Sequence, residues 1–329
     1  MNTYKIIDTG ISNPVVSIAM LAYNHSKYID QALESVLMQK TTFSFKIIIA
    51  EDCSTDDTRA IILDYQDRYP DKFKVLLQNQ NIGAQINNFD LLSNLEGKYI
   101  AALEGDDYWT DPYKLQKQVD FLEANPEYVI TGHDSTCIDK NGAPVNHQYI
   151  PEKFKSDCPS NQLKKGFWIA TLTMCFRNLP VLKNYPHEAY HIKNGDTFLI
   201  CVLGQFGNYK YMTDIKPAAY RVHAGGIWSL NNSLANAVDQ KHTEVKLVEY
   251  FTRIGDLETA AHFKKDILNI CNQNIFSAAW QNRNRQLFYA YFIKTFLYFV
   301  ASGQLKRAVN NLKTLIKYSL QTNQDTTTK

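Results

Sequence analysis

Three carboxylates follow one another closely at the end of an apolar run. Glu104, Asp106 and Asp107 come directly after the run YIAAL, which has the composition of a buried strand. Because like charges this close raise one another's pKa, they need a cation or a hydrogen-bond network to compensate them. The segment is therefore either a solvated turn or a site for a cation. We favour the site, because the intervening glycine lets a ligand approach the backbone and Trp109 is costly to expose without a ligand.

Two further polar motifs also follow strand-like runs. AYNH and EDCSTDD each lead from such a run into a helix-like segment, and the alternation continues to about residue 133. This order predicts an α/β fold in which helices cover a mainly parallel sheet. Such sheets bind ligands at the carboxyl ends of their strands, so the three motifs should converge. The expected strands are 15–21, 45–50, 73–77 and 99–103, and the expected helices are 28–39, one around 61–65, 86–94 and 112–124.

The motifs exclude several common kinds of site. AYNH contains no glycine, so it is neither a phosphate-binding loop nor a dinucleotide fingerprint. EDCSTDD lacks the glycine and the distant glutamate that a calcium loop requires. A turn followed by a helix cap is the better interpretation of residues 54–57.

The composition indicates a globular protein from a reducing compartment. The chain has 329 residues, 45% of them hydrophobic, and a net charge of +2, which suggests about two domains. Its six cysteines form no CxxC pair, which favours free thiols over disulfides or a zinc site. The N-terminus lacks the pattern of a signal peptide, and no apolar stretch reaches the length of a spanning helix. We therefore expect a cytoplasmic protein, and we expect no nucleic-acid partner.

The C-terminal segment differs from the rest of the chain in charge. Residues 281–320 contain seven lysines or arginines and no acidic residue. Apolar residues at helical spacing predict a helical pair that packs one face on the preceding domain. The basic, aromatic-rich surface predicts peripheral, salt-sensitive contact with the inner face of an anionic membrane. The expected packing face is Leu305, Val309, Leu312 and Leu315 or Ile316.

Five ordered segments carry a family resemblance. They are VSIAMLAYNHSKYIDQALESVLMQ, IIIAEDCSTDDT, NQNIGAQINNF, GKYIAALEGDDYWTDPYKLQKQVDFLEANPE and YRVHAGGIWS, which span about residues 14–230. In order and spacing they closely resemble the family 2 glycosyltransferases of the GT-A fold. Glu51 and Cys53 stand where many members have Asp and Gly, and Gln85 lies where many have Arg.

The resemblance implies a metal-dependent reaction. Asp107, together with Asp106 and His223, would coordinate Mn²⁺ or Mg²⁺, ions that favour hard oxygen ligands. Such an ion stabilises the charge that develops on the leaving diphosphate. Gly225 and Gly226 would let the segment after His223 fold over the donor as a lid. The nucleotide-sugar-binding residues implied are Ala22, Tyr23, Asn24, Asp52, Asn81, Gly83, Glu104, Asp106 and Arg221.

The resemblance also assigns residues on the acceptor side. Asp196 would be the catalytic base of an inverting displacement, although its place just before an apolar helix also suits an N-cap. Trp109 and Trp168 would contact the acceptor. Residues 166–177 look like a strand that brings Trp168 beside the donor site, and a core position for Trp168 is an equal alternative.

The sequence therefore predicts an enzyme with two regions. A GT-A domain would occupy 1–235, with a nucleotide-sugar half at about 14–133 and an acceptor half at about 134–235. A helical region would follow at 236–320, and a disordered tail at 321–329. The expected activity is transfer from a nucleoside diphosphate sugar, a UDP-sugar by expectation, to a glycan or lipid-linked glycan in surface polysaccharide synthesis.

Two alternative functions remain open at this point. A non-catalytic sugar-nucleotide sensor would keep Asp52 but dispense with Asp196. A sugar-phosphate nucleotidyltransferase would need a glycine-rich loop after the first strand, where this chain has AYNH.

Overall fold

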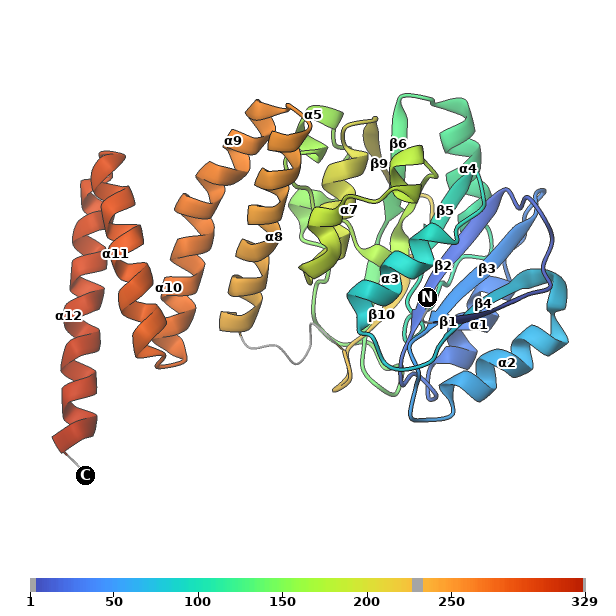
Figure 1. Ribbon diagram of the computed structural model, residues 1–329, viewed down its shortest axis with the longest axis horizontal. Coiled ribbons are helices and arrows are strands. Elements are labelled where there is room, and N and C mark those ends of the chain that lie inside the picture. The colour runs from blue at the N-terminus through green and yellow to red at the C-terminus, as the bar shows by residue number, and fades with distance from the viewer. Residues whose placement is uncertain (1–3, 227–232, 328–329) are drawn as a thin grey trace. The chain divides into compact units, whose positions relative to one another are not determined.

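Two units make up the chain in the computed structural model (Figure 1). The structure describes residues 4–226 and 233–327, without the side chains of His191, Leu268 and 318–327. Of these, the first unit contains 4–191 and 195–226, and the second contains 192–194 and 233–327. The domain boundary expected at residue 235 falls in the first turn of helix α8 (Ser233–Arg253).

A mixed, mainly parallel sheet forms the centre of the first unit. Its strand order is β1-β4-β3-β2-β5-β8-β6-β9, and β10 pairs with β7 in a separate two-stranded sheet. Strands β2 to β5 are mutually parallel, whereas β1 and β8 run antiparallel to their neighbours. The strands are β1 Tyr4–Asp8, β2 Val16–Ala22, β3 Phe45–Glu51, β4 Phe73–Gln78, β5 Tyr99–Ala102, β6 Tyr128–His133, β7 Ser135–Ile138, β8 Cys175–Arg177, β9 Asn208–Met212 and β10 Ala218–Arg221.

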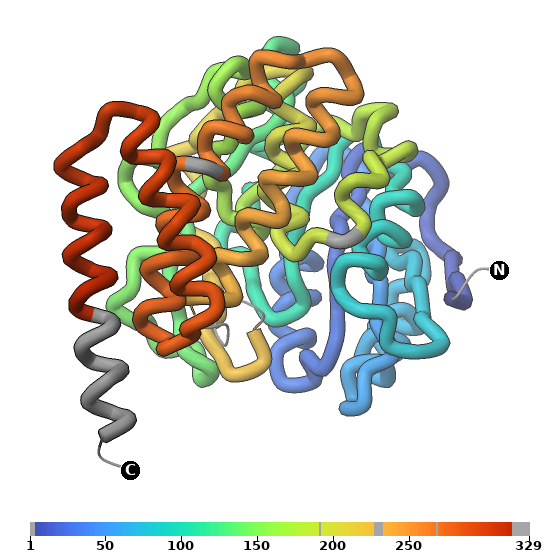
Figure 2. The backbone as a smooth tube through the Cα atoms, turned by 60° about the vertical axis from the view of Figure 1, so that its left-hand side comes forward, coloured from blue at the N-terminus to red at the C-terminus, as the bar shows by residue number. Residues whose placement is uncertain are grey.

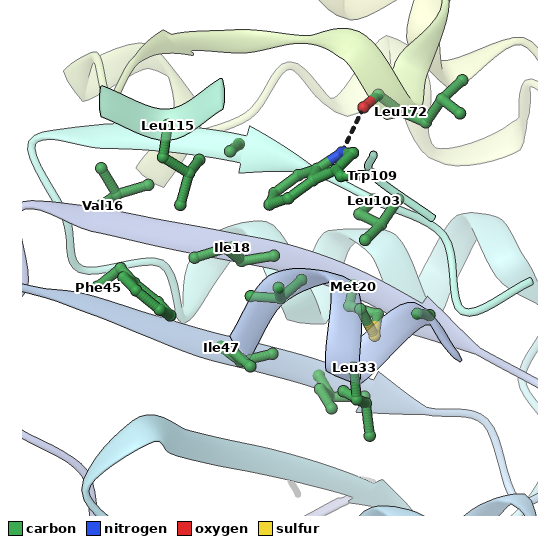
Figure 3. Packing of buried hydrophobic residues seen from close by; sticks show 14 of the residues in the cluster. Val16, Ile18, Met20, Leu33, Phe45, Ile47, Leu103, Trp109, Leu115 and Leu172 are labelled. Carbon is green, nitrogen blue, oxygen red and sulfur yellow. Dashed lines mark hydrogen bonds between the residues drawn. The ribbon is translucent and has the colours of Figure 1, made fainter. Parts of the chain in front are cut away.

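Helices cover both faces of this sheet. Every residue of β3 is buried, and its alternate side chains enter two different hydrophobic clusters, as expected for a parallel strand between two helical layers. Figure 3 shows one cluster, in which Ile18, Met20 and Ile47 pack against Leu33 of α1. The helices are α1 Ile29–Leu37, α2 Thr58–Arg68, α3 Ala84–Ser93, α4 Lys114–Ala124, α5 Ser160–Leu163, α6 Pro180–Lys183 and α7 Gly195–Leu203. The predicted α/β fold class is confirmed.

The segment 166–177 differs from its predicted strand. Only Cys175–Arg177 is a strand, and a short 3-10 helix, Thr171–Thr173, precedes it. The hydroxyl of Thr173 donates to the carbonyl of Ala170 at 2.7 Å, a local bond that competes with an extended ladder. Helix α4 also begins later than expected, at Lys114, while the carboxylate of Asp111 accepts from the amide of Tyr113.

Trp109 lies in the core and not at an acceptor surface. Its side chain is 1% exposed, and its indole nitrogen donates to the carbonyl of Leu172 at 2.7 Å (Figure 3). The ammonium of Lys114 lies 4.1 Å from the centre of its ring. The prediction that Trp109 contacts the acceptor is therefore wrong, because the indole has no accessible face. Burial together with a partner for the N–H is the usual arrangement for a core tryptophan.

We expect Trp109→Phe to lower stability without changing donor affinity. Phenylalanine retains a ring but leaves the carbonyl of Leu172 unpaired, which costs about 1–3 kcal/mol in free energy of unfolding. Urea unfolding of the wild type and the variant measures the difference. Unchanged stability combined with a raised acceptor KM would contradict the structural role.

The second unit is a succession of helices. They are α8 Ser233–Arg253, α9 Leu257–Asp266, a π-helical turn Ile267–Cys271, α10 Asn272–Gln281, α11 Arg285–Ala301 and α12 Leu305–Thr327. Aromatic side chains join α10 to α11, where the rings of Phe276 and Phe288 stack with centres 4.9 Å apart. Helices α11 and α12 lie side by side, as both views show (Figures 1 and 2). The predicted C-terminal helical region is confirmed.

The outer face of α12 differs from its prediction. The expected packing face is Leu305, Val309, Leu312 and Leu315 or Ile316. All of these except Leu315 are 39–66% exposed, whereas Ala308 and Asn311 are buried. The helix thus packs through a neighbouring face, with Leu315 against the α10–α11 cluster.

The C-terminal end of the chain differs from its prediction. Helix α12 extends to Thr327, so the structure gives helical backbone to residues 321–327, where the sequence predicts disorder; residues 328–329 lie outside the description. None of the helices in the described ranges is both long and apolar enough to cross a bilayer.

Candidate active site

The three polar motifs leave the sheet at one edge. Ala22, the last residue of β2, pairs with Glu51 at the end of β3, and Ala102 at the end of β5 pairs with Ala19. The segments that follow these parallel strands are therefore neighbours, as the sequence predicts for AYNH, EDCSTDD and EGDD.

The first two of these loops are bonded to each other. Asn24 donates its backbone N–H to the hydroxyl of Ser54 at 3.0 Å, and its side-chain oxygen accepts from the amide of Thr55 at 2.8 Å. Asn24 has φ 56°, a left-handed conformation that asparagine tolerates better than most residues. Tyr23, beside it, is 40% exposed, so its ring is available to a ligand at this edge.

Asp52 organises a third loop. Its two carboxylate oxygens accept from the amides of Ile82 at 2.8 Å and Gly83 at 2.9 Å, and the side chain of Asn81 donates to its carbonyl at 3.3 Å. Gly83 has φ 85°, which suits glycine and lets the chain turn toward the carboxylate. Asp52 is 2% exposed, and burial raises its pKa although both amides oppose the shift. Asn81 and Gly83 thus shape the loop, and Asp52 holds it in place.

Asp106 meets two histidines. Its Oδ2 lies 2.9 Å from Nε2 of His223 and 3.7 Å from Nε2 of His25. The amide of Gly225 donates to Nδ1 of His223, so the tautomer that satisfies both bonds carries its proton on Nε2 and donates to Asp106. Burial opposes ionisation of Asp106, but this bond and the nearby imidazoles outweigh burial and lower its pKa.

Asp107 points into the protein. It is 3% exposed, and its Oδ1 accepts from the backbone N–H of Arg221 at 2.7 Å. Tyr108 and Ala219 continue this contact as an antiparallel bridge. Burial, and then the charges of Asp106 and Glu104, raise the pKa of Asp107 well above its usual value. Asp107 therefore joins the EGDD segment to β10. Because His223 follows Arg221 by two residues, this bond also places His223 near Asp106.

Each nitrogen of the Arg221 guanidinium donates a hydrogen bond within the protein. Arg221 is 4% exposed, and its nitrogens donate to the carbonyls of Asp106 and Asp139 and to the side chain of Gln31. Its carbon also lies 4.6 Å from the centre of the Tyr28 ring. These three bonds use three of the five N–H groups of the guanidinium, and through them Arg221 supports the EGDD segment. Contact of Arg221 with the nucleotide stays a prediction.

Glu104 and Asp196 are two acids close enough to influence each other electrostatically. Burial, and then the charge of Asp106, raise the pKa of Glu104 to about 8, and the charge of Asp196 adds to this. The Oε2 atom of Glu104 is buried with no hydrogen-bond partner among the described residues. Asp196 lies in the first turn of α7, where Oδ1 accepts from the amide of Thr197 at 2.7 Å, and burial raises its pKa.

A row of aromatic rings lies beside these acids. Tyr149 stacks on Tyr220 with centres 3.8 Å apart and meets Trp168 edge-on at 4.9 Å. The charges of Glu104 and Asp196 are among the influences that raise the pKa of Tyr149, after burial. Trp168 is only partly buried, so both of its expected roles, core packing and ligand contact, agree with its position.

Sequence reasoning missed three residues of this site. His25 belongs to AYNH, but only the fold shows that its ring faces Asp106. Tyr149 and Tyr220 come from distant segments, and no spacing in the sequence joins them. The closeness of Tyr220 to Arg221 and His223 along the chain was the one available signal.

Comparison with known proteins identifies the family. The pattern of glycosyl transferase family 2 matches residues 17–185, about half of the chain. The chain therefore belongs to glycosyl transferase family 2. An uncharacterised protein of Mycobacterium tuberculosis is 37% identical over 213 residues, which are 65% of this chain and 60% of that protein. The matched region thus spans less than two thirds of that relative's length.

Further similarities concern a named relative and two solved structures. The putative teichuronic acid biosynthesis glycosyltransferase TuaG of Bacillus subtilis is 35% identical over 133 residues, 39% of this chain and 52% of TuaG. S. aureus TarS, solved with UDP-GlcNAc, superposes with a TM-score of 0.56 at 17% identity, covering 93% of this chain and 91% of that one. The mannosyltransferase PcManGT from Pyrobaculum calidifontis, solved with GDP-Man and Mn²⁺, gives 0.53 at 14% identity, with 97% and 89% covered. At these identities the structural likeness concerns the fold, which is of the GT-A type.

Proposed function

We propose that this protein is a metal-dependent, inverting glycosyltransferase that uses a nucleoside diphosphate sugar. The observation that carries the proposal is the meeting of Asp106 and His223 at the end of β5, on the same sheet edge as the loops of Tyr23 and Asp52. Acids placed at the carboxyl ends of parallel strands suit a diphosphate with its cation. Family membership and the nucleotide sugars bound by TarS and PcManGT support the same conclusion.

The residues present fit a divalent cation. Oδ2 of Asp106 and Nε2 of His223 share a hydrogen bond at 2.9 Å, and a divalent cation bound by both atoms would displace the proton between them. No group of three or more potential ligands in the described part of the chain is arranged to hold a metal alone. Mg²⁺ commonly binds one or two carboxylates together with substrate phosphates, so the diphosphate would complete the site.

Asp106 and His223 would therefore hold Mn²⁺ or Mg²⁺, with Asp107 positioning both. The ion would stabilise the charge that develops on the leaving diphosphate. Tyr23 would line the nucleotide base, and Ala22, Asn24, Asn81 and Gly83 would shape the surrounding loops. Asp52, which holds one of these loops, would contact the base through its remaining acceptor capacity.

Inversion needs a base on the acceptor side. Asp196 would accept the proton of the acceptor hydroxyl, which attacks the sugar carbon opposite the diphosphate as the bond to that group breaks. Glu104, with an unpartnered buried oxygen, would orient a sugar hydroxyl. Trp168 and Tyr149 would offer aromatic surface to the acceptor ring.

The acceptor proposed is a glycan or lipid-linked glycan of a surface polysaccharide. The relative TuaG is named for teichuronic acid synthesis, which supports this class. A lipid-linked acceptor would require the enzyme to work at a membrane, and the basic residues of 281–320 supply a positively charged surface for peripheral contact there. A non-catalytic sensor is less well supported, because it has no need of a further acid such as Asp196 close to Glu104.

Donor-dependent stabilisation tests the proposal. We expect one of UDP-GlcNAc, UDP-glucose, UDP-galactose or GDP-mannose to raise the Tm, and to do so only with Mn²⁺ or Mg²⁺. A ligand at 100 times its Kd stabilises the native state by about 2.7 kcal/mol. Release of free nucleoside diphosphate from that donor then separates an enzyme from a sensor. No shift with any of the four donors in the presence of metal would contradict the proposal.

A further inference from the structure

Helices α11 and α12 each carry an exposed apolar stripe. On α11, Ile293, Leu297 and Val300 recur at i, i+4 and i+7. On α12, four exposed apolar residues recur at i, i+4, i+7 and i+11. Positions with this spacing lie on one side of a helix. All seven side chains are at least 39% exposed, and Leu305 reaches 66%. We call these two rows the apolar stripes; the row on α12 is Leu305, Val309, Leu312 and Ile316.

The apolar stripes lie outside the faces through which α11 and α12 pack. Each helix already packs through another face, which on α11 contains Phe288, Phe292 and Phe299, each at most 8% exposed. On α12 the buried residue is Ala308, with Leu315 against the cluster of α10 and α11. The stripes are therefore additional apolar surface, of a kind that soluble proteins seldom display in rows without a partner.

Lysines lie along one edge of the α12 stripe. Lys306, Lys313 and Lys317 each follow a stripe residue by one position, which places them about 100° further around the helix axis. All three are exposed. No acidic residue occurs from 281 to 324, so α11 has no acid, and the one acid of α12, Asp325, lies near the end of that helix. An apolar face edged with lysines, on a helix too polar to span, is the pattern of an interfacial helix.

We propose that the α11–α12 pair docks in the plane of an anionic bilayer, with the apolar stripes inserted at the boundary between headgroups and acyl chains. The lysines would then lie at the level of the phosphates. The peripheral membrane contact proposed above is electrostatic, and insertion of the apolar stripes would add a hydrophobic contribution to it. This insertion does not depend on the catalytic assignments.

Charge favours a lipid surface over a second copy of the chain. In a symmetric dimer formed through the same stripe, the lysines at its edge would approach their own copies, and Asp325 would be the one acid of each α11–α12 pair to offset them. Anionic headgroups offset the same charges at once. The apolar area and the positive edge thus both suit a membrane.

Flotation of the full-length protein with vesicles tests the inference. We expect binding to vesicles of equal parts phosphatidylglycerol and phosphatidylcholine, with weaker binding to phosphatidylcholine alone. Replacing Leu305, Leu312 and Ile316 together by Gln should weaken binding at least about tenfold. Replacing Lys306, Lys313 and Lys317 by Gln should weaken it about fivefold per lysine. Leu257→Gln on α9, at a residue also 66% exposed, is the matched control and should bind as wild type.

A depth probe separates insertion from surface attraction. Leu312→Trp should gain fluorescence on binding and be quenched by brominated acyl chains more strongly than the wild type. Binding that survives loss of the three apolar residues, or fluorescence of the Leu312→Trp variant that bromine leaves unchanged, would overturn insertion. A dimer that the apolar variant dissociates, with no vesicle binding, would assign the stripes to a second copy. Donor hydrolysis should be equal in the wild type and in all these variants. Absence of hydrolysis in the wild type would contradict the catalytic proposal and would leave the vesicle result unaffected.

Discussion

Turnover should fall on the order of 10²-fold or more when Asp196 is replaced by Asn, with donor affinity close to that of the wild type. Asparagine keeps an oxygen for the amide of Thr197, so the first turn of α7 retains its bond. The amide cannot accept a proton from the acceptor hydroxyl. Single-turnover transfer and donor binding, measured on the same preparation, give the two quantities.

The pH dependence of the wild type provides the control for this variant. Burial raises the pKa of Asp196, and a base acts only when it is deprotonated. Activity should therefore rise as the pH increases through that raised pKa, and Asp196→Asn should lose this limb. If donor binding and Tm decline together with turnover, the residue is a structural cap and the base lies elsewhere.

Metal-dependent donor binding should be lost in Asp106→Asn, by on the order of 10²-fold or more, because a bound cation contributes several kcal/mol. The amide oxygen can still accept from Nε2 of His223, which preserves the local arrangement. Titration of the donor with and without Mn²⁺ measures the loss.

Asp107→Asn is the matched comparison for this second prediction. Its side-chain oxygen can still accept from Arg221, so the strand contact should persist and the loss of donor affinity should be smaller. The reverse order, with Asp107→Asn abolishing the metal dependence and Asp106→Asn retaining it, would return the ligand role to Asp107. The family resemblance favours Asp107, because it matches the last acid of the family's DxD-like motif.

The main features of the first unit were predictable from local pattern. β2, β3, β4 and β5 are short apolar runs, each followed by a turn and a helix, and their parallel order follows from that alternation. The convergence of AYNH, EDCSTDD and EGDD needed only the rule on strand ends. Periodicity also predicted a helical pair within 281–320, where the structure has α11 and most of α12.

The errors share one physical origin, which is long-range contact. Trp109 looks like a binding residue in LEGDDYW, and only the carbonyl of Leu172 shows that its indole belongs inside. The bonds from Arg221 to Gln31 and Asp139 likewise join distant segments, and no pattern in the sequence indicates them. A helical pattern gives the apolar faces of α12 but cannot tell which one meets a neighbour, so the exposed stripe was assigned to the core.

The bond between Asp107 and Arg221 joins residues 114 positions apart in the chain. Closing a loop of that length costs conformational entropy, which the folded unit must offset before the two histidines and Asp106 can meet. A fragment that ends after α4 contains every acid of the EGDD motif but lacks β10 and His223. The motif is contiguous, so a fragment that contains residues 104–107 carries all of it. The site depends on contacts between residues far apart in the chain, so it forms only when the whole first unit has folded.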